Sequence, residues 1–231
     1  ILKQIIQLGE MHEYLVYHYG PARFEFLKSK KNVHSLSLKK GPFIPKRIQR
    51  YRPYLSEEIS VTKALVKFRP HILFQVGHWA DFAHYPCKKV HTIHDLAFLH
   101  PEYKAYFPGP MARELKKFTE RRVADSSYLI AVSENTKRDL IDYFGFPSER
   151  IAVIGHGFEK SLFNTEKGNK RDIYQRCSIS EPFIVSVGVL QPRKNFHRLI
   201  KAFYALKKAN SIPHKLIIIG GRAWQYENIE A

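Results

Sequence analysis

The feature that most constrains the fold is a regular alternation of short apolar runs with longer amphipathic segments. We expect strands at 33–38, 71–76, 89–94, 128–132, 151–154, 183–187 and 215–219. We expect helices at 1–19, 55–68, 111–124, 133–145 and 196–209. Strands that alternate with helices of about ten to fifteen residues indicate a parallel sheet covered by helices on both faces. The sequence therefore predicts an α/β fold built from Rossmann-like units.

The length and composition allow two such units. The chain has 231 residues, of which 44% are hydrophobic, so it is not expected to be disordered. The polar stretch 164–171 interrupts the alternation, and a new strand-helix-strand series follows it. We therefore predict one Rossmann-like domain over residues 1–165 and the incomplete start of a second over residues 166–231.

The sequence contains few signals of the cellular compartment. No apolar run approaches the roughly 20 residues that span a bilayer, so we expect a cytoplasmic protein. The first residue is Ile1, which we interpret as an internal start. Cys87 and Cys177 match no metal or redox spacing and are expected to be reduced thiols.

The charge is strongly basic, with 38 Lys and Arg against 21 Asp and Glu and a net charge of +17. Between Lys28 and Arg52 no acidic residue interrupts the basic ones. The run consists of Lys28, Lys30, Lys31, Lys39, Lys40, Lys46, Arg47, Arg50 and Arg52, with Phe43, Tyr51 and Tyr54 beside it. Such a run binds anionic lipid, nucleic acid or a polyanionic acceptor, or it is a solvated loop that keeps the protein soluble.

A glycine turn with two basic residues follows the apolar run 183–187. Gly188 lets the backbone approach a ligand, and Arg193 and Lys194 lie where a helix is expected to begin. Helix amino termini favour anions, arginine can hold two phosphate oxygens, and lysine adds a mobile charge. The pattern indicates a diphosphate site; the alternative is a solvated basic turn.

Two further candidate sites follow expected strands. His94 and Asp95 come after 89–94, and Ser133, Glu134 and Asn135 come after 128–132. Ligands of parallel sheets bind at the carboxyl ends of strands, so we expect these two sites and the Gly188–Lys194 turn to share one edge. The alternatives are an Asx turn at Asp95 and a simple helix cap at Ser133. No metal site is expected, because an odd spacing sends His91 and His94 to opposite faces of a strand.

Several of these segments together resemble a known family. Residues 131–140, 147–154 and 187–195, with 92–96 and 216–224, are similar to the retaining GT-B glycosyltransferases of family four, which include many bacterial mannosyltransferases. The resemblance runs from about residue 72 to the end of the chain. Its most specific part is the turn that carries Arg193 and Lys194.

The resemblance implies two facing Rossmann-like domains, with the acceptor held by residues 1–165 and a nucleotide sugar by the second domain. It also implies retention of anomeric configuration, with no cofactor and no required metal. Arg193 and Lys194 would then hold the donor diphosphate, which Gly188 allows to approach. His94 would contact the transferred sugar, and Asp95 would orient His94 or its loop. Ser133 and Glu134 would be acceptor or sugar contacts.

The sequence departs from the family pattern in three places. A pair of glutamates eight positions apart is expected well beyond Lys194, and a first strand with a glycine-rich loop is expected before the opening helix; neither occurs between residues 1 and 231. His156 and Gly157 stand where the family usually has Asn and Gly. We therefore expect a chain truncated at both ends and inactive alone.

The leading hypothesis is a fragment of a hexosyltransferase that uses a nucleotide-sugar donor and a lipid-linked or polysaccharide acceptor. The basic run between Lys28 and Arg52 would face an anionic membrane at its inner surface, or a phosphorylated acceptor, and nucleic acid is not an expected partner. One alternative is a sugar-nucleotide epimerase with the same fold. The other is a non-catalytic basic protein that binds nucleic acid or anionic lipid.

Overall fold

The computed structural model describes residues 2–19, 30–38, 45–49, 55–76, 85–161, 163, 174–175, 178–179 and 182–223. These residues form two compact units. The first contains the described parts of Ile1–Ala97 and Arg113–Gly157, and the second those of Phe98–Ala112 and Phe158–Ala231. Helices alternate with parallel strands in both, which confirms the α/β class. The domain boundary expected at residue 165 lies outside the described residues and stays a prediction.

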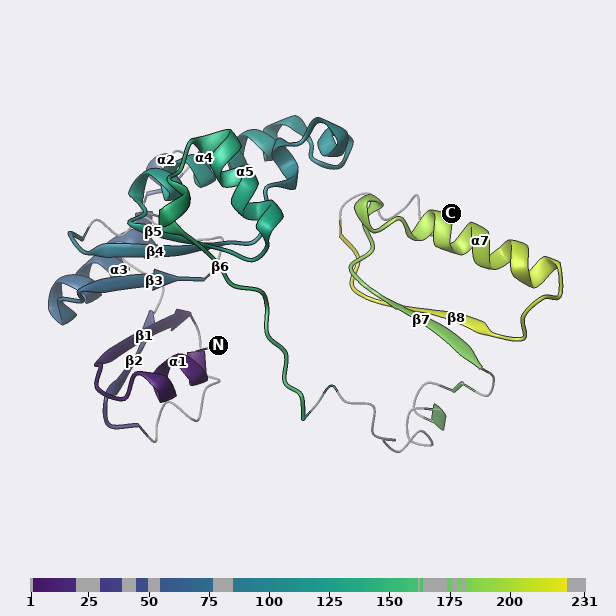
Figure 1. Ribbon diagram of the computed structural model, residues 1–231, viewed down its shortest axis with the longest axis horizontal. Coiled ribbons are helices and arrows are strands. Elements are labelled where there is room, and N and C mark those ends of the chain that lie inside the picture. The colour runs from purple at the N-terminus through teal and green to yellow at the C-terminus, as the bar shows by residue number, and fades with distance from the viewer. Residues whose placement is uncertain are drawn as a thin grey trace. The chain divides into compact units, whose positions relative to one another are not determined.

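The first unit is built on a parallel four-stranded sheet in the order β3-β4-β5-β6 (Figure 1). Its strands are β3 (Ile72–Gln75), β4 (Lys88–Ile93), β5 (Tyr128–Ala131) and β6 (Ile151–Val153). Its longer helices are α3 (Leu55–Phe68), α4 (Gly109–Asp125, shared with the second unit) and α5 (Glu134–Phe144). Because neighbouring strands are parallel, all four carboxyl ends lie at one edge of this sheet.

The expected helix over residues 1–19 is wrong in its second half. Helix α1 (Leu2–Leu8) ends before Gly9, and residues Tyr14–Tyr19 form strand β1. This strand pairs in parallel with β2 (Val33–Leu38) in a two-stranded sheet. Three of the six residues of β1 are tyrosine and one is valine, residue types that favour strands, and glycine disfavours continuation of the helix.

The other predicted elements of this unit are present with small shifts at their ends. Short elements that the sequence did not indicate are α2 (Lys46–Gln49) and η4 (Ser148–Arg150) in this unit, η2 (Ala97–Leu99) at its boundary and η3 (Pro101–Tyr106) in the second unit. The predicted loop over residues 41–45 falls, apart from Pro45, outside the described residues.

A hydrophobic cluster joins α3 to the strands of the first unit. Val61 and Leu65 of α3 and Leu73 of β3 are each at most 5% exposed. Tyr17 of β1 and Leu36 of β2 pack against this cluster, as do Tyr85 and Cys87. The cluster therefore ties the two-stranded sheet to the helix that precedes β3.

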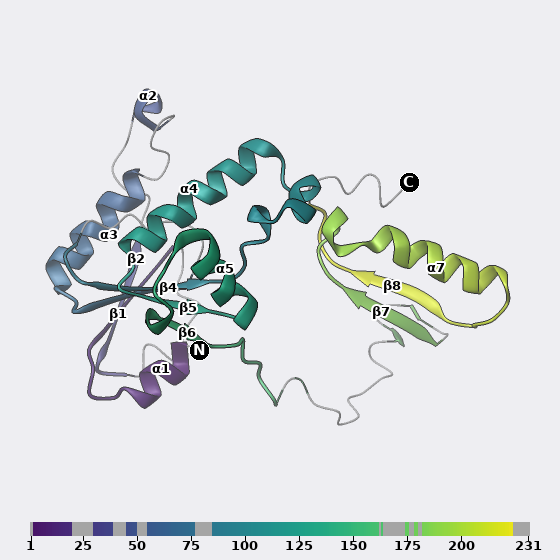
Figure 2. The same cartoon turned by 45° about the horizontal axis from the view of Figure 1, so that its top comes forward.

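The second unit contains a parallel pair of strands, β7 (Phe183–Val187) and β8 (Lys215–Ile219). Helix α7 (Phe196–Lys208) connects them and lies along one side of the pair in both views (Figures 1 and 2). Phe196, at the start of α7, is 3% exposed and lies under Gly188. All three elements were expected from the sequence.

No helix among the described residues is both long enough and apolar enough to cross a bilayer.

Candidate functional site

Three polar segments meet at the carboxyl edge of the four-stranded sheet. His94 follows β4, Ser133 follows β5, and His156 lies three residues beyond the end of β6. The sequence predicted the first two at one edge, and the parallel register of β4 and β5 confirms this. The third was noticed only as a departure from a family pattern, without a structural role.

His94 and His156 form a stacked pair at this edge. Their ring centroids are 5.2 Å apart, the ring planes differ by 15°, and Nδ1 of His94 lies 3.3 Å from Nε2 of His156. The other nitrogen of His94, Nε2, lies 2.9 Å from the carbonyl oxygen of Val76, just beyond β3. The His94 ring therefore contacts the segments that follow two other strands of the sheet.

The hydrogen bonds of this pair determine its neutral tautomers. The Val76 carbonyl can only accept, so Nε2 of His94 carries the proton and its Nδ1 is an acceptor. Nε2 of His156 must then donate to Nδ1 of His94. A neutral His156 consequently has its own Nδ1 unprotonated, and this side chain is exposed.

Ser133 and Thr136 connect the start of α5 to the end of β4. The Ser133 hydroxyl accepts from the backbone N–H of Thr136 at 3.1 Å and lies 3.0 Å from the Thr136 hydroxyl. The Thr136 hydroxyl in turn donates to the carbonyl oxygen of His94 at 3.4 Å. Ser133 is thus the predicted helix cap, and it also fixes the backbone beneath His94.

Asp95 and Glu134 play different local parts. The carboxylate of Asp95 accepts from the backbone N–H of Ala97 at 3.3 Å, which is the Asx turn that the sequence allowed as an alternative. Asp95 thereby orders the loop after β4. Glu134 is the first residue of α5, where its negative charge complements the helix dipole, and its side chain is exposed.

In the second unit, the turn between β7 and α7 presents Arg193 and Lys194. Both residues belong to η5 (Pro192–Lys194), and Asn195, in a left-handed conformation, separates this turn from α7. Their side chains are exposed, and neither makes a hydrogen bond or ion pair with another described residue. Gln191, at the base of the turn, is only 5% exposed. The turn thus presents two exposed cationic side chains and is anchored at the buried residue Gln191.

The glycines of this turn have unequal roles. Gly188 donates its N–H to Ile219 at 2.9 Å, and a Cβ there would make only ordinary contacts with Phe196 and Lys194. At Gly220, a Cβ would overlap the carbonyl group of Gly188, whereas at Gly221 it would meet nothing. The position that requires glycine for close backbone approach is therefore Gly220.

The expectation that all three candidate sites share one sheet edge is wrong. The Gly188–Lys194 turn follows β7, which pairs with β8 in a separate sheet of the second unit. Strand periodicity shows which end of a strand carries a polar residue, but it does not show which strands pair with one another. The Arg193–Lys194 turn is accordingly a site of its own.

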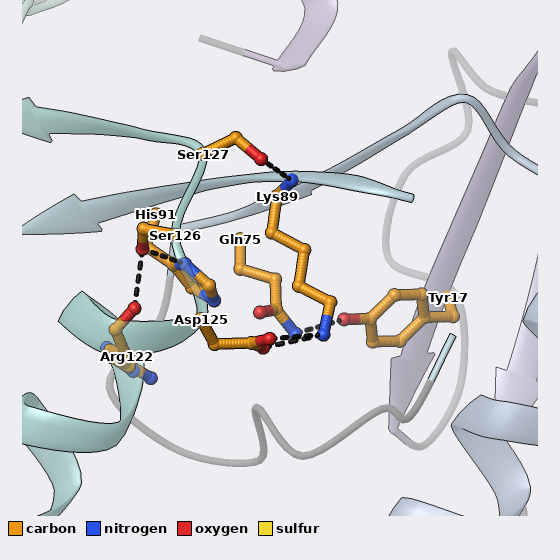
Figure 3. Close-up of polar contacts among 8 residues, drawn as sticks. All are labelled: Tyr17, Gln75, Lys89, His91, Arg122, Asp125, Ser126 and Ser127. Atoms are coloured by element: carbon orange, nitrogen blue, oxygen red, sulfur yellow. Dashed lines mark hydrogen bonds and ion pairs between the residues drawn. The ribbon is translucent and has the colours of Figure 1, made fainter. Parts of the chain in front are cut away.

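A buried polar cluster lies among β1, β3, β4 and the end of α4 (Figure 3). Lys89, 7% exposed, donates through Nζ to both carboxylate oxygens of Asp125, at 2.8 and 2.6 Å. Gln75 donates to the hydroxyl of Tyr17 at 3.1 Å, which connects the two sheets of the first unit. This cluster could not be predicted from the sequence, because charged residues within strands usually face solvent.

His91 is fully buried in this cluster. The Ser126 hydroxyl donates to the carbonyl oxygen of Arg122 at 2.6 Å, so Nδ1 of His91, 2.7 Å away, must donate to Ser126 (Figure 3). Burial lowers the pKa of His91 to about 4, which keeps the ring neutral at pH 7. Its Nε2 has no hydrogen-bond partner among the described residues.

Arg122 and Tyr17 of this cluster also have shifted pKa values. Burial lowers the pKa of Arg122 to about 10, although the nearby Tyr17 opposes this shift. Burial raises the pKa of Tyr17, so its phenol is neutral. Burial thus favours the neutral form of Tyr17 and disfavours the charge of Arg122.

Within the described part of the chain, no three His, Cys, Asp or Glu side chains are grouped to hold a metal ion. Cys87 is a free thiol, and burial raises its pKa; Cys177 lies outside the described residues. Of the basic run, only Lys30, Lys31, Lys46 and Arg47 are described, and Lys30 is bonded to Glu10 at 3.0 Å. The proposed partners of this run therefore stay predictions.

Two parallel-sheet units, one with a polar sheet edge and the other with a basic turn before a helix, define an α/β protein of the GT-B glycosyltransferase class. Solved structures agree with this fold. HepE from Anabaena, in complex with UDP and glucose, superposes with a TM-score of 0.61 at 20% identity, over 94% of this chain and 55% of that one. A glycosyltransferase from Rickettsia africae gives 0.50 at 13% identity, over 95% and 62%.

The profile described as Glycosyltransferase Family 4 matches residues 3–162, and that described as Glycosyl transferases group 1 matches residues 172–230. The chain belongs to glycosyltransferase family 4, as its sequence resemblance indicated.

Curated relatives are also distant in sequence. The O-antigen chain mannosyltransferase B of Escherichia coli is 23% identical over 140 residues, which cover 60% of this chain and 36% of that protein. The D-inositol 3-phosphate glycosyltransferase of Corynebacterium glutamicum is 24% identical over 217 residues, covering 87% and 51%. The chain thus spans about half or less of the curated relatives it matches.

Proposed function

We propose that the protein transfers a hexose from a nucleotide sugar to a lipid-linked or polysaccharide acceptor, with retention of anomeric configuration. The observation that carries this proposal is the exposed Arg193–Lys194 pair on the turn between β7 and α7. A diphosphate leaving group gains negative charge as its bond to the sugar breaks. Two cations on a turn that begins at the buried residue Gln191 stabilise that charge without a metal ion.

The turn has the properties that such a site needs. Its backbone is fixed by Lys194 N–H donating to Gln191 at 3.0 Å and by Asn195 N–H donating to Pro192 at 3.0 Å. Gly188 and Gly220 bring the two strand ends into close backbone contact beside it. A fixed backbone limits the region that the guanidinium and ammonium groups can occupy, so less entropy is lost when they meet phosphate oxygens than if the turn itself had to become ordered.

The sheet edge of the first unit is proposed to receive the sugar and the acceptor. His94 contacts the transferred sugar in this proposal, Asp95 holds the following loop, and Ser133 and Glu134 lie beside the acceptor. The hydrogen bond from Thr136 to the His94 carbonyl supports a defined position for that histidine. The protein would act at the cytoplasmic face of a membrane, with its basic run toward anionic lipid or a phosphorylated acceptor.

The relatives support a sugar as the transferred group. The O-antigen chain mannosyltransferase B of Escherichia coli is one of them, and the Anabaena neighbour was solved in complex with UDP and glucose. Neither the epimerase nor the non-catalytic basic protein is favoured by these comparisons. These relatives favour a hexose, such as mannose or glucose, as the transferred sugar.

Calorimetry with UDP and GDP tests the donor site. Arg193→Ala removes charged hydrogen bonds of about 1.5–3 kcal/mol each, so we expect the Kd to rise about tenfold to a hundredfold. Lys208→Ala removes one positive charge at the far end of α7 and is expected to leave the Kd nearly unchanged. Equal affinities of Arg193→Ala and the unchanged protein would remove this assignment. NMR of the anomeric proton in the product tests retention.

A further inference from the structure

We infer that His156 is a second sugar-contacting residue at the carboxyl edge of the four-stranded sheet, and that it offers the open ring nitrogen that His94 lacks. The inference rests on the proposed function, because it specifies how that edge meets a hydroxyl-bearing ligand. It begins from the position of His156. This residue lies just beyond β6 and stacks on His94, and both belong to the first unit.

Both ring nitrogens of His94 are occupied in the ligand-free chain. Nε2 donates to the Val76 carbonyl at 2.9 Å, and Nδ1 accepts from His156 at 3.3 Å. A sugar hydroxyl that bonded to His94 through nitrogen would have to replace one of these contacts. Replacing the Nε2 contact would leave the Val76 carbonyl without this donor, and replacing the Nδ1 contact would break the hydrogen bond to His156.

His156 meets the opposite condition. Its Nε2 donates to His94, and its Nδ1 has no hydrogen-bond partner among the described residues, while the side chain is exposed. In the neutral ring Nδ1 is an acceptor, so it can accept a hydrogen bond from a sugar hydroxyl without breaking any existing bond. Asparagine at this position would offer a different, shorter polar group.

The two histidines of the pair have different roles. His94 is held by Val76 on one side, and its backbone is held by Thr136. It therefore acts as a fixed platform that orients His156 through stacking and one hydrogen bond. His94 thus positions His156 in addition to making its own proposed contact with the sugar, and both rings lie where ligands of parallel sheets bind.

The first test requires no ligand. Long-range ¹⁵N–¹H NMR of histidine-labelled protein at pH 8 distinguishes the two tautomers of each ring, and the variants His94→Gln and His156→Gln assign the signals. We expect both His94 and His156 to carry their proton on Nε2. A His156 ring that carries its proton on Nδ1 would overturn the inference whatever the protein catalyses.

The second test separates sugar from nucleotide. His156→Phe keeps an aromatic ring for stacking but has no nitrogen, and we expect it to weaken binding of UDP-glucose or GDP-mannose about three- to tenfold while leaving UDP or GDP unaffected. His156→Gln restores a side-chain acceptor and should recover part of the loss. His71→Gln, an exposed histidine before β3 at the amino edge of the same sheet, is the matched control.

The outcomes are distinct. Equal sugar-nucleotide binding by His156→Phe and His71→Gln would overturn the inference and leave the proposed function standing. An unchanged protein that binds none of the nucleotides would overturn the proposed function and the sugar contact together.

Discussion

His91 and His94 stand three positions apart, one within β4 and one just beyond it, yet their surroundings differ completely. His91 is 0% exposed and bonded to Ser126, whereas His94 is partly exposed and stacked on His156. The odd spacing predicted that a strand would send the two rings to opposite faces, and their different burial agrees with this. It could not predict the burial of His91, because that depends on α4 returning to the sheet more than thirty residues later in the chain.

The neutral, buried state of His91 predicts a loss of stability in acid. Its pKa falls from 6.5 in the unfolded chain to about 4 in the folded one. Between these values the unfolded state binds more protons, so the contribution of His91 is complete above pH 6.5 and is lost as pH falls toward 4. The expected loss is about 3 kcal/mol of unfolding free energy.

Urea denaturation at pH 7 and pH 4.5 measures this effect. The charges of Asp125 and Lys89 also act on the His91 ring, and other acidic and histidine side chains of the chain contribute to the pH dependence, so the difference from a variant is the relevant quantity. His91→Gln should reduce the acid sensitivity, and His71→Gln, at an exposed site, should keep it. The same pH dependence in the protein and in His91→Gln would show that His91 does not cause it.

At the scale of elements, α5 shows how far local signals reach. Ser133 accepts from Thr136 at its start, and Gly145, with φ of 63°, ends it as the sequence predicted. Both signals depend on neighbouring residues alone. The opening segment shows the opposite case. Its apolar residues suit a helix, but pairing with β2 decides that Tyr14–Tyr19 is a strand.

Replacement of the α5 cap gives a measurable cost. Ser133→Ala removes the acceptor for the Thr136 N–H, and we expect a loss of about 1 kcal/mol in thermal or urea unfolding. Ser133→Asp retains a cap and should lose much less. Full stability in Ser133→Ala would mean that water replaces the hydroxyl at this helix end.

The pair β7 and β8 predicts a sharper contrast between adjacent glycines. Gly220→Ala places a methyl group against the Gly188 carbonyl and should destabilise the second unit by about 1–3 kcal/mol or more. Gly221→Ala meets open space and should change stability by less than about 0.5 kcal/mol. Hydrogen exchange of the β7 and β8 amides localises the effect. Similar exchange in the two variants would contradict the close contact.

At the scale of the whole molecule, the α/β class and the parallel strands were predictable, because both follow from periodicity along the chain. The assignment of strands to sheets was not, since nothing local to Gly188 or Arg193 indicates that β7 pairs only with β8 among the described strands. The Arg193–Lys194 turn was predicted from its residues. The open nitrogen of His156 was not, because it depends on a contact with a residue 62 positions away.

The guanidinium of Arg150 lies just before β6, and it donates to the carbonyl oxygens of Ser126 and Ser127 at 2.7 Å each. These acceptors lie at the junction of α4 and β5, so both bonds span the whole of α5. Because these bonds join residues 23 and 24 positions apart in the chain, we expect them to form late in folding, after α5 and β5. We therefore expect the bonds of Arg150 to be absent from the transition state for folding. Their loss should then raise the rate of unfolding more than it lowers the rate of folding.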